Sequence, residues 1–321
     1  MRVVLVIAAV LGGGTAVGAE RSVGAGAQYP TLSAAVAASG DGDVIRLAAG
    51  TYYECAVLPQ RDLLLEGDGA DTVLSDTTCQ GKALIVAVGD RITIRNLTLA
   101  RARVPDRNGA GVRLEGQGVT LDRVRFENNQ VGVLAGAAGA GTVLIRDCTF
   151  SGGGVSGERP SFAVWVGAVG RLRIERSVFE AVKGGQVSTA AAQSEVVGTT
   201  MATGVEDGAG AAITASGPLL LQDSVVALGP GRPPRNAAVV ATGPDVAVER
   251  TTLRNMTGQK ATLLLDWTTG TPRLAGNVVA AGDTEVSDDG LLRHRTGNLA
   301  RGVVGEMRRA AGQVKRAVLG P

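Results

Sequence analysis

A phrase of about ten residues recurs along most of this chain, and its spacing constrains the fold more than any other feature. One copy is VLIRDCTFSG (143–152), in which Val143 and Ile145 alternate as in a strand before the chain breaks at Arg146-Asp147 and resumes at Cys148. Aligned on the third residue, the copies place equivalent positions 23 to 29 residues apart at Ile94, Leu121, Ile145, Ile174, Val197, Leu221, Val248 and Leu274. A period of this size, repeated so often, indicates a stacked repeat architecture.

Each copy contains two short strands joined by a two-residue corner, then a loop, then a third strand that ends near glycine. The third strands are GVRLEG (111–116), VGVLAG (131–136), AVWVG (163–167), AAITASG (211–217) and AAVVATG (237–243). Strands without helical periodicity and with turn signals between them indicate a parallel β-solenoid. Three strands in each coil of about 25 residues predict an all-β fold, a right-handed parallel β-helix of about nine coils with short helical caps.

Two interior columns follow from the alignment. A corner slot holds Leu97, Val124, Cys148, Ser177, Thr200, Ser224, Thr251 and Asn277. Two residues further on, an apolar column holds Leu99, Phe126, Phe150, Phe179, Ala202, Val226, Leu253 and Val279. Cys148 is therefore interpreted as a small buried residue in a ladder and not as a nucleophile.

The first 19 residues have the pattern of a secretory signal peptide. Arg2 is followed by an apolar run over 3–11, and Val17-Gly18-Ala19 is typical of a cleavage site. An uncleaved membrane anchor is the alternative, although the run is short for a bilayer span. We expect a periplasmic or secreted protein, in a compartment that permits disulfides. Cys55 and Cys79 lie 24 residues apart, one coil length, so they should stack closely enough to form a bridge.

Both ends of the solenoid, which we expect to span residues 20–300, need caps because an open β-helix exposes core and unpaired backbone. Residues 31–40 (TLSAAVAASG) predict a short helix with Thr31 or Ser33 as N-cap and Gly40 at its end. Residues 301–321 predict a basic amphipathic helix or tail. Its apolar stripe is Val303, Met307, Ala310, Val314 and Val318. This segment is interpreted as a cap or frayed tail, with contact to a membrane surface or an anionic polymer as the alternative, and Trp267 is expected to pack beneath it.

The stretch QYPTLSAAVAASGDGDVIRLAAGTYYECAVL (28–58) resembles the opening of pectin methylesterases and of the wider group of pectate-lyase-like β-helix proteins. The match includes a G-x-Y-x-E segment, Gly50 to Glu54, and LLLEGDGADTVL (63–74) resembles the opening coil of that group. The resemblance implies the β-helix fold. The catalytic motifs of pectin methylesterases, of the forms Q-D-T-L, D-F-I-F-G and L-G-R-P-W, are not matched here, so esterase chemistry is not carried over.

One group of residues is a candidate site on the outer side of the third strands. The loop ARARVPDRNGA (100–110) leads into Arg113 and Glu115, and the loop ENNQ (127–130) lies one coil on. Candidate catalytic residues are Arg113, Glu115 and Asp106, with Arg113 as base or charge clamp. Candidate binding residues are Trp165, as a sugar-stacking platform, with Arg107, Glu127 and Asn129. An ordinary solvated surface is the alternative interpretation.

Composition limits the remaining functions. The net charge of +2 gives no support for nucleic-acid binding. The chain has no CxxC pair and one histidine, so we expect no metal site and no cofactor. We expect a monomer. Two hypotheses remain: a protein that binds polysaccharide or another cell-envelope component without turnover, or a carbohydrate-active enzyme, such as a lyase, epimerase or esterase, with a non-standard site. A smooth Ser/Thr/Val face would favour the first, and converging acids or aromatics the second.

Overall fold

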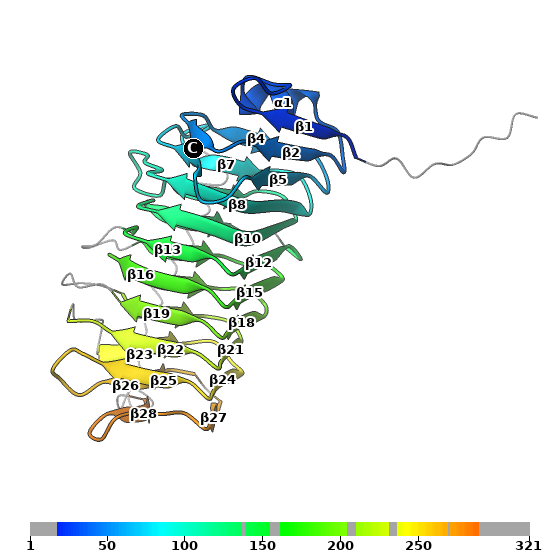
Figure 1. The fold of residues 1–321 in the computed structure, drawn as a ribbon. Coiled ribbons are helices and arrows are strands. Elements are labelled where there is room, and N and C mark those ends of the chain that lie inside the picture. The colour runs from blue at the N-terminus through cyan, green and yellow to red at the C-terminus, as the bar shows by residue number, and fades with distance from the viewer. Residues whose placement is uncertain are drawn as a thin grey trace, which may run out of the picture.

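The strands of the protein stack into one right-handed parallel β-helix of about 10 turns (Figure 1). The structure is a computed structural model that describes residues 18–136, 139–154, 161–203, 210–230, 236–268 and 270–288. The all-β solenoid expected from the repeats is confirmed. The expected signal peptide falls almost entirely on residues 1–17, and the expected C-terminal helix falls on 301–321; both segments lie outside the described residues.

Most turns contribute three strands, which belong to two sheets. The opening strand is β1 (Glu20–Val23). First strands are β2 (Val44–Leu47), β5 (Leu64–Gly67), β12 (Thr142–Arg146), β15 (Arg171–Glu175), β18 (Ser194–Val197), β21 (Leu219–Gln222), β24 (Val246–Glu249) and β27 (Arg273–Ala275). Second strands are β3 (Gly50–Tyr52), β6 (Thr72–Ser75), β13 (Thr149–Ser151), β16 (Val178–Val182), β19 (Thr200–Thr203), β22 (Val225–Leu228) and β25 (Thr252–Asn255). First and second strands run together in β8 (Ile92–Ala100) and β10 (Gly118–Glu127).

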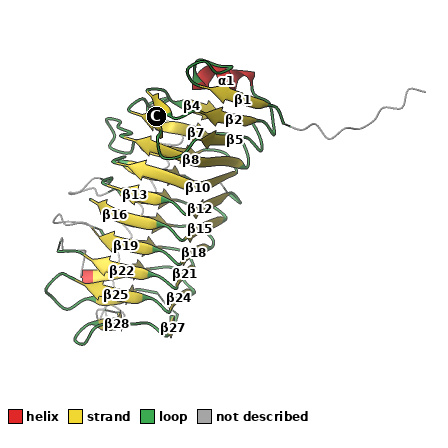
Figure 2. Ribbon diagram, viewed as in Figure 1, coloured by secondary structure: helices red, strands yellow, loops and turns green. Residues whose placement is uncertain are grey.

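These strands, with β1, form an 18-stranded sheet, and the third strands form a separate 10-stranded sheet. The third strands are β4 (Ala56–Leu58), β7 (Ala83–Ala87), β9 (Ala110–Leu114), β11 (Val131–Ala135), β14 (Phe162–Val166), β17 (Gly185–Thr189), β20 (Ile213–Ala215), β23 (Ala237–Ala241), β26 (Thr262–Asp266) and β28 (Thr284–Ser287). All pairings between these strands are parallel, so each residue lies beside the equivalent residue of the next turn (Figure 2).

The interior is a stack of like residues. Phe126, Phe150 and Phe179 stack face to face, with ring centroids 4.6 and 4.5 Å apart. These distances follow the strand spacing of about 4.8 Å. Across the core from this stack, a Cβ on Gly111 or Gly132 would come within 2.7 Å of a ring carbon of Phe126 or Phe150. Glycine at these two positions therefore gives the rings their room.

In one turn the observed register corrects the sequence alignment. Ile174 pairs with Val196 and not with Val197, so the corner there is Gly198. The ladder slot of this turn consequently holds Thr199 and not Thr200, and the apolar column holds Met201 and not Ala202. The sequence VVGTT repeats both Val and Thr, so alternation of apolar and polar residues could not choose between the two registers.

The corner slot forms a hydrogen-bonded ladder from Cys148 onward. Ser177 Oγ accepts a hydrogen bond from the Cys148 amide (3.2 Å) and donates one to the Glu175 carbonyl (2.8 Å). Thr199 and Ser224 repeat this arrangement in the next turns, with Thr199 N donating to Ser224 Oγ at 3.1 Å. Cys148 is buried in the corner slot between apolar residues of the earlier turns and hydroxyl residues of the later turns. Burial raises the pKa of its thiol to about 12. It is therefore an unreactive structural residue, as expected.

The corner itself is a single residue in the left-handed helical region. Successive turns place Asn96, Arg123, Asp147, Arg176, Gly198, Asp223, Arg250 and Gly276 there, with φ between 43° and 63°. This conformation costs an L-residue roughly 1 kcal/mol. Bidentate pairs between neighbouring turns offset part of the cost: Arg176 binds Asp147 at 2.9 and 2.8 Å, and Arg250 binds Asp223 at 2.6 and 3.1 Å. This explains why the strand breaks at Arg146-Asp147 and resumes immediately.

A short helix closes the N-terminal end. Helix α1 (Leu32–Ala38) begins after Thr31, whose side chain accepts from the Ala34 amide, as one of the two expected N-caps. Glu54 also accepts hydrogen bonds from the helix N-terminus, at 3.0 Å from Leu32 N and 3.4 Å from Ser33 N. Tyr52 donates to the Ala48 carbonyl at 2.8 Å. The G-x-Y-x-E segment therefore fastens the cap to the first turn.

The expected disulfide is present next to this cap. Cys55 and Cys79 are bonded, with a sequence separation of 24 and 5.4 Å between their Cα atoms. The bridge joins two adjacent turns at the N-terminal end of the solenoid, where the terminal turn packs against one other turn only. It therefore cross-links the turns that have the least packing support.

Removing the bridge should destabilise the protein. We expect Cys55→Ala/Cys79→Ala to lower the free energy of unfolding by about 3 kcal/mol, from the chain entropy of a closed loop of this length. Urea unfolding followed by circular dichroism measures the change. Cys148→Ser is the matched control, because serine occupies the same slot one turn on. Equal unfolding midpoints for the double variant and the parent would contradict a stabilising role.

The hydroxyl ladder can be tested separately. Ser177→Ala removes one acceptor and leaves the buried Cys148 amide without it, so the free energy of unfolding should fall by about 1–3 kcal/mol. The control is Ser151→Ala, a half-buried serine on the outer side of β13. If both variants unfold at the same urea concentration, the ladder contributes nothing specific.

Candidate functional site

The solenoid has three outer faces, one for each set of strands, and the sequence-predicted site residues are divided among them. Arg113 and Glu115 come together on the third-strand face, with Arg113 Nε 3.2 Å from Glu115 Oε1. Lys82 Nζ contacts the same carboxylate oxygen at 2.7 Å. Only 2% of the Arg113 side chain is exposed, and this burial lowers the pKa of its guanidinium. The arrangement is a carboxylate held between two cations, with little of Arg113 open to a ligand.

The other predicted residues lie elsewhere. Asp106 and Arg107 are exposed in the loop before β9. Glu127 is on the second-strand face, with Oε1 3.2 Å from Arg125 Nε. Asn129 is buried inside its loop, where its amide accepts from Ala102 N and donates to the Leu99 carbonyl, both at 2.8 Å. Asn129 thus binds backbone of the neighbouring turn.

Trp165 occupies the outward column of the third strands, as expected, but it is half-buried. Its ring lies edge-on to Phe162, with centroids 5.9 Å apart, and it packs beside Leu134 in an apolar cluster. An exposed, flat sugar-stacking platform would require the face of the indole to be open.

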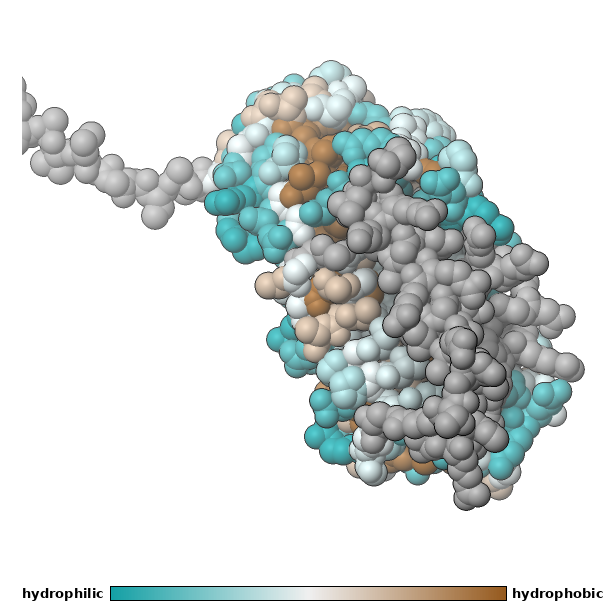
Figure 3. Space-filling model, turned by 180° about the vertical axis from the view of Figure 1, so that it is seen from behind, coloured by the Kyte–Doolittle hydropathy of each residue, from teal (hydrophilic) through white to brown (hydrophobic). Residues whose placement is uncertain are grey.

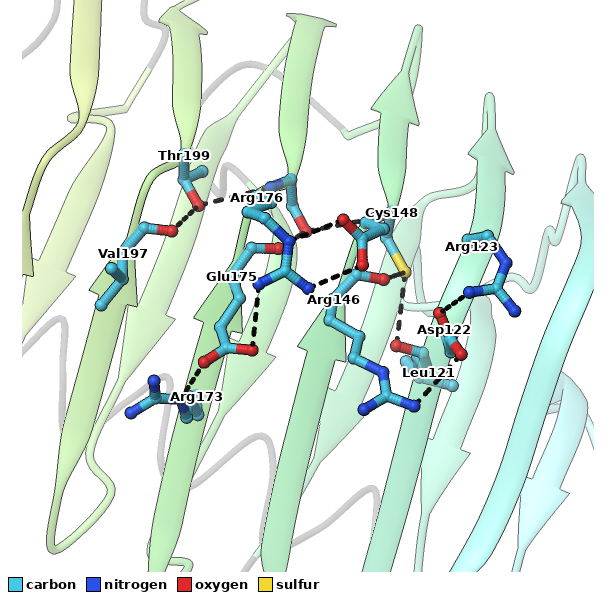
Figure 4. Close-up of polar contacts among 12 residues, drawn as sticks. Leu121, Asp122, Arg123, Arg146, Cys148, Arg173, Glu175, Arg176, Val197 and Thr199 are labelled. Atoms are coloured by element: carbon cyan, nitrogen blue, oxygen red, sulfur yellow. Dashed lines mark hydrogen bonds and ion pairs between the residues drawn. The ribbon is translucent and has the colours of Figure 1, made fainter.

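The first-strand face carries a ladder of alternating charge. One outward column contains, turn by turn, Arg46, Glu66, Arg95, Asp122, Arg146 and Glu175. Figure 4 shows the later part of this face, where Asp122 contacts Arg123 at 2.9 Å and Arg146 at 3.2 Å. Glu175 similarly contacts Arg173 and Arg176.

Glu66 is held most closely. Arg95 Nε lies 2.6 Å from Glu66 Oε1, and Arg46 binds the other oxygen. The hydrogen bond from Arg95 holds the pKa of the Glu66 carboxyl below its usual range. A carboxylate paired in this way keeps its charge and is a poor proton donor, so this ladder is suited to holding turns in register.

The second-strand face has a different surface, which was not predicted from the sequence. Its outward column alternates threonine and valine, turn by turn, as Thr149, Val178, Thr200, Val225, Thr252 and Val278. All six side chains are half-buried or exposed, and Val278 is 58% exposed. We call this column the Thr/Val strip. Aligning the residue just before the apolar column, in the corrected register, would have revealed it.

The middle turns of the strip have flat surroundings. The neighbouring outward column has the small residues Ala202 and Ala227 beside Thr200 and Val225. In the turns beyond them this column holds Glu180 and Arg254, which are exposed and of opposite charge. Threonine and valine are stiff at χ1, so the strip loses little side-chain entropy when it is covered. The hydroxyls recur at every second turn, about 9.6 Å apart at twice the usual strand spacing. Such a surface can hold an extended chain with a regular repeat.

The described residues contain no cluster of three or more His, Cys, Asp or Glu side chains placed to hold a metal ion. Within the same part of the chain, no helix is long and apolar enough to cross a bilayer.

Comparison with known proteins gives likenesses of fold. No protein-family model and no curated protein matches the sequence. Among solved structures, the pectin methylesterase of Aspergillus niger is 15% identical, with a TM-score of 0.48, over 83% of this chain and 89% of that one. That of Erwinia chrysanthemi is 12% identical (TM-score 0.45; 87% and 95% covered), and that of carrot is 18% identical (TM-score 0.41; 85% and 90% covered). Likenesses of this size carry no argument about the chemistry of this protein.

The charge ladder should make stability depend on pH. Because the folded-state pKa of Glu66 is below its ordinary value, its stabilising effect is complete above about pH 5 and is lost as pH falls through the folded pKa. Glu66→Gln should therefore reduce the fall in urea midpoint between about pH 6 and pH 3. The control is Glu180→Gln, an exposed residue of the second-strand face. An unchanged pH dependence in Glu66→Gln would contradict the assignment.

Proposed function

We propose that the protein is a periplasmic or secreted scaffold that binds an extended polysaccharide of the cell envelope along the Thr/Val strip, without turning it over. The observation that carries the proposal is the strip itself: six turns of uncharged, stiff, partly exposed side chains in register. A polymer whose repeat matches two turns would meet the same hydroxyl and the same methyl groups at each repeat. Many weak equivalent contacts then add along the chain.

The charges beside the strip favour a neutral or weakly charged polymer. The corner residues next to it are neutralised in pairs, as in Asp147 with Arg176 and Asp223 with Arg250. Among these described corners, no row of side chains with the same charge runs alongside the strip. The corners therefore attract a polyanion only weakly at long range. Binding should consequently vary little with salt concentration, unlike binding to an oppositely charged surface.

The proposed location is supported by two features. The bridge between Cys55 and Cys79 is of the kind that persists in oxidising compartments. The proposed cleavage after Ala19 would start the mature chain at Glu20, the first residue of β1. Processing would then leave the first strand intact.

The test is binding of the mature protein to an array of neutral and acidic polysaccharides. Thr200→Arg/Thr252→Arg places two long charged side chains on the strip and should weaken binding at least about ten-fold, a loss of about 1.4 kcal/mol. Thr120→Arg is the control, a half-buried threonine on the outward side of the first-strand part of β10. Equal binding by the double variant and the control would remove the strip from the site.

The same samples decide the alternative, a carbohydrate-active enzyme. Absorbance of unsaturated sugars reports a lyase, and released methanol or acetate reports an esterase. Binding without products supports the scaffold. Products that disappear in an Arg113→Ala variant would instead support the Arg113–Glu115 pair as the centre of an enzyme.

A further inference from the structure

Two apolar clusters lie on the outer side of the third-strand sheet, separate from the core inside the solenoid. The first consists of Ala83, Val86, Ala110, Val131 and Leu134, with Val57, Cys79 and Trp165 against it. The second consists of Ala211, Ala237, Val240 and Leu265, with Trp267 against it. The described surface seen from behind is mixed, with separate brown apolar patches among teal hydrophilic ones (Figure 3). We call these two clusters the outer apolar face.

The strand register shows that this face points away from the core. One column runs through Val86, Arg113, Leu134, Trp165, Ser188, Thr214, Val240 and Leu265. The adjacent residues of the same strands, such as Ile85 and Ala87, belong to the interior cluster. Even so, Val86, Leu134 and Leu265 are at most 2% exposed. Outward side chains that are closed to water need a covering layer.

The chain itself supplies a segment that fits. The last described strand, β28, is the edge strand of this same sheet, and residues 289–321 follow it. Their apolar stripe is Val303, Met307, Ala310, Val314 and Val318. A helix over 301–321 would be about 31 Å long, which matches about six strand spacings. The intervening residues 289–300 reach up to about 40 Å when extended, enough to place that helix anywhere along the face.

We propose that segment 301–321 lies lengthwise on the outer apolar face as an intramolecular strap, with its stripe against the two clusters. The chain leaves the solenoid at the edge of this sheet, so a short linker keeps the stripe at high effective concentration beside its partner surface. The strap turns Arg308, Arg309, Lys315 and Arg316 toward water. Trp165 and Trp267 then serve as apolar contacts for the strap, and the Thr/Val strip on the other sheet stays open.

The test uses the two tryptophans, which are the only two in the chain and both belong to the outer apolar face. In the full mature chain, Met307→Gln/Val314→Gln should displace the strap, shift tryptophan emission to longer wavelength and roughly double acrylamide quenching. The matched control is Arg309→Gln/Arg316→Gln, which introduces the same residues on the opposite side of the helix and should leave both signals unchanged. Far-UV circular dichroism verifies that each variant retains the β-helix.

Several results would overturn the proposal. Unchanged emission and quenching in folded Met307→Gln/Val314→Gln would show that the stripe does not cover the face. Tryptophan shielding that depends on protein concentration, with dimers in sedimentation, would assign the face to a second copy of the chain. Shielding that develops only with phosphatidylserine vesicles, and is lost in Arg309→Gln/Arg316→Gln, would assign the segment to a membrane surface. Should Met307→Gln/Val314→Gln fail to fold, the milder Val303→Gln carries the same comparison.

Discussion

Parallel stacking is the constraint on which the rest of this structure depends. Each side chain lies one strand spacing, about 4.8 Å, from the side chain in the same slot of the next turn. The residue in each slot must therefore pack favourably against the residue in the same slot of the next turn. The protein meets this requirement in different ways: Phe126, Phe150 and Phe179 stack their rings, the corner ladder links hydroxyl to amide, and Glu66 lies between two arginines. Identical charges are absent from neighbouring slots of the first-strand ladder over 46–175, because they would repel.

At the corners, ion pairs between stacked turns offset part of the conformational free energy of a left-handed residue. A left-handed arginine or aspartate is unfavourable alone, yet the same conformation recurs at the equivalent corner of the next turn and brings the two side chains alongside each other. The pair Asp62 and Arg91 and the pair Asp76 and Arg101 repeat, at other corners, what Asp147 and Arg176 do. Exposed ion pairs contribute little individually. Bidentate geometry adds specificity of register, which matters more here than the energy of one pair.

The sequence was sufficient for the fold because the repeat is a local signal that recurs. It predicted the strands, the cap helix over 31–40, the stacked phenylalanines and the bridge between Cys55 and Cys79. It failed at Val197, where adjacent identical residues leave the register undefined. It also grouped Glu127 and Asn129 with Arg113 because their loop lies one coil after the loop 100–110. The structure places Glu127 on the second-strand face and buries Asn129 inside its loop, away from Arg113. Which face a residue joins depends on where each corner falls, and loops of variable length hide that position.

The three outer faces differ in what a ligand would have to displace. On the first-strand ladder, an incoming molecule would have to break ion pairs such as Arg95 with Glu66, and their replacement by new contacts yields little net free energy. On the third-strand face, Val86 and Leu134 are already closed to water, so a ligand gains no further burial there. The Thr/Val strip is partly exposed, uncharged and rigid. Covering it removes apolar surface from water without breaking a salt bridge in the strip, which is why a ligand gains most on this face.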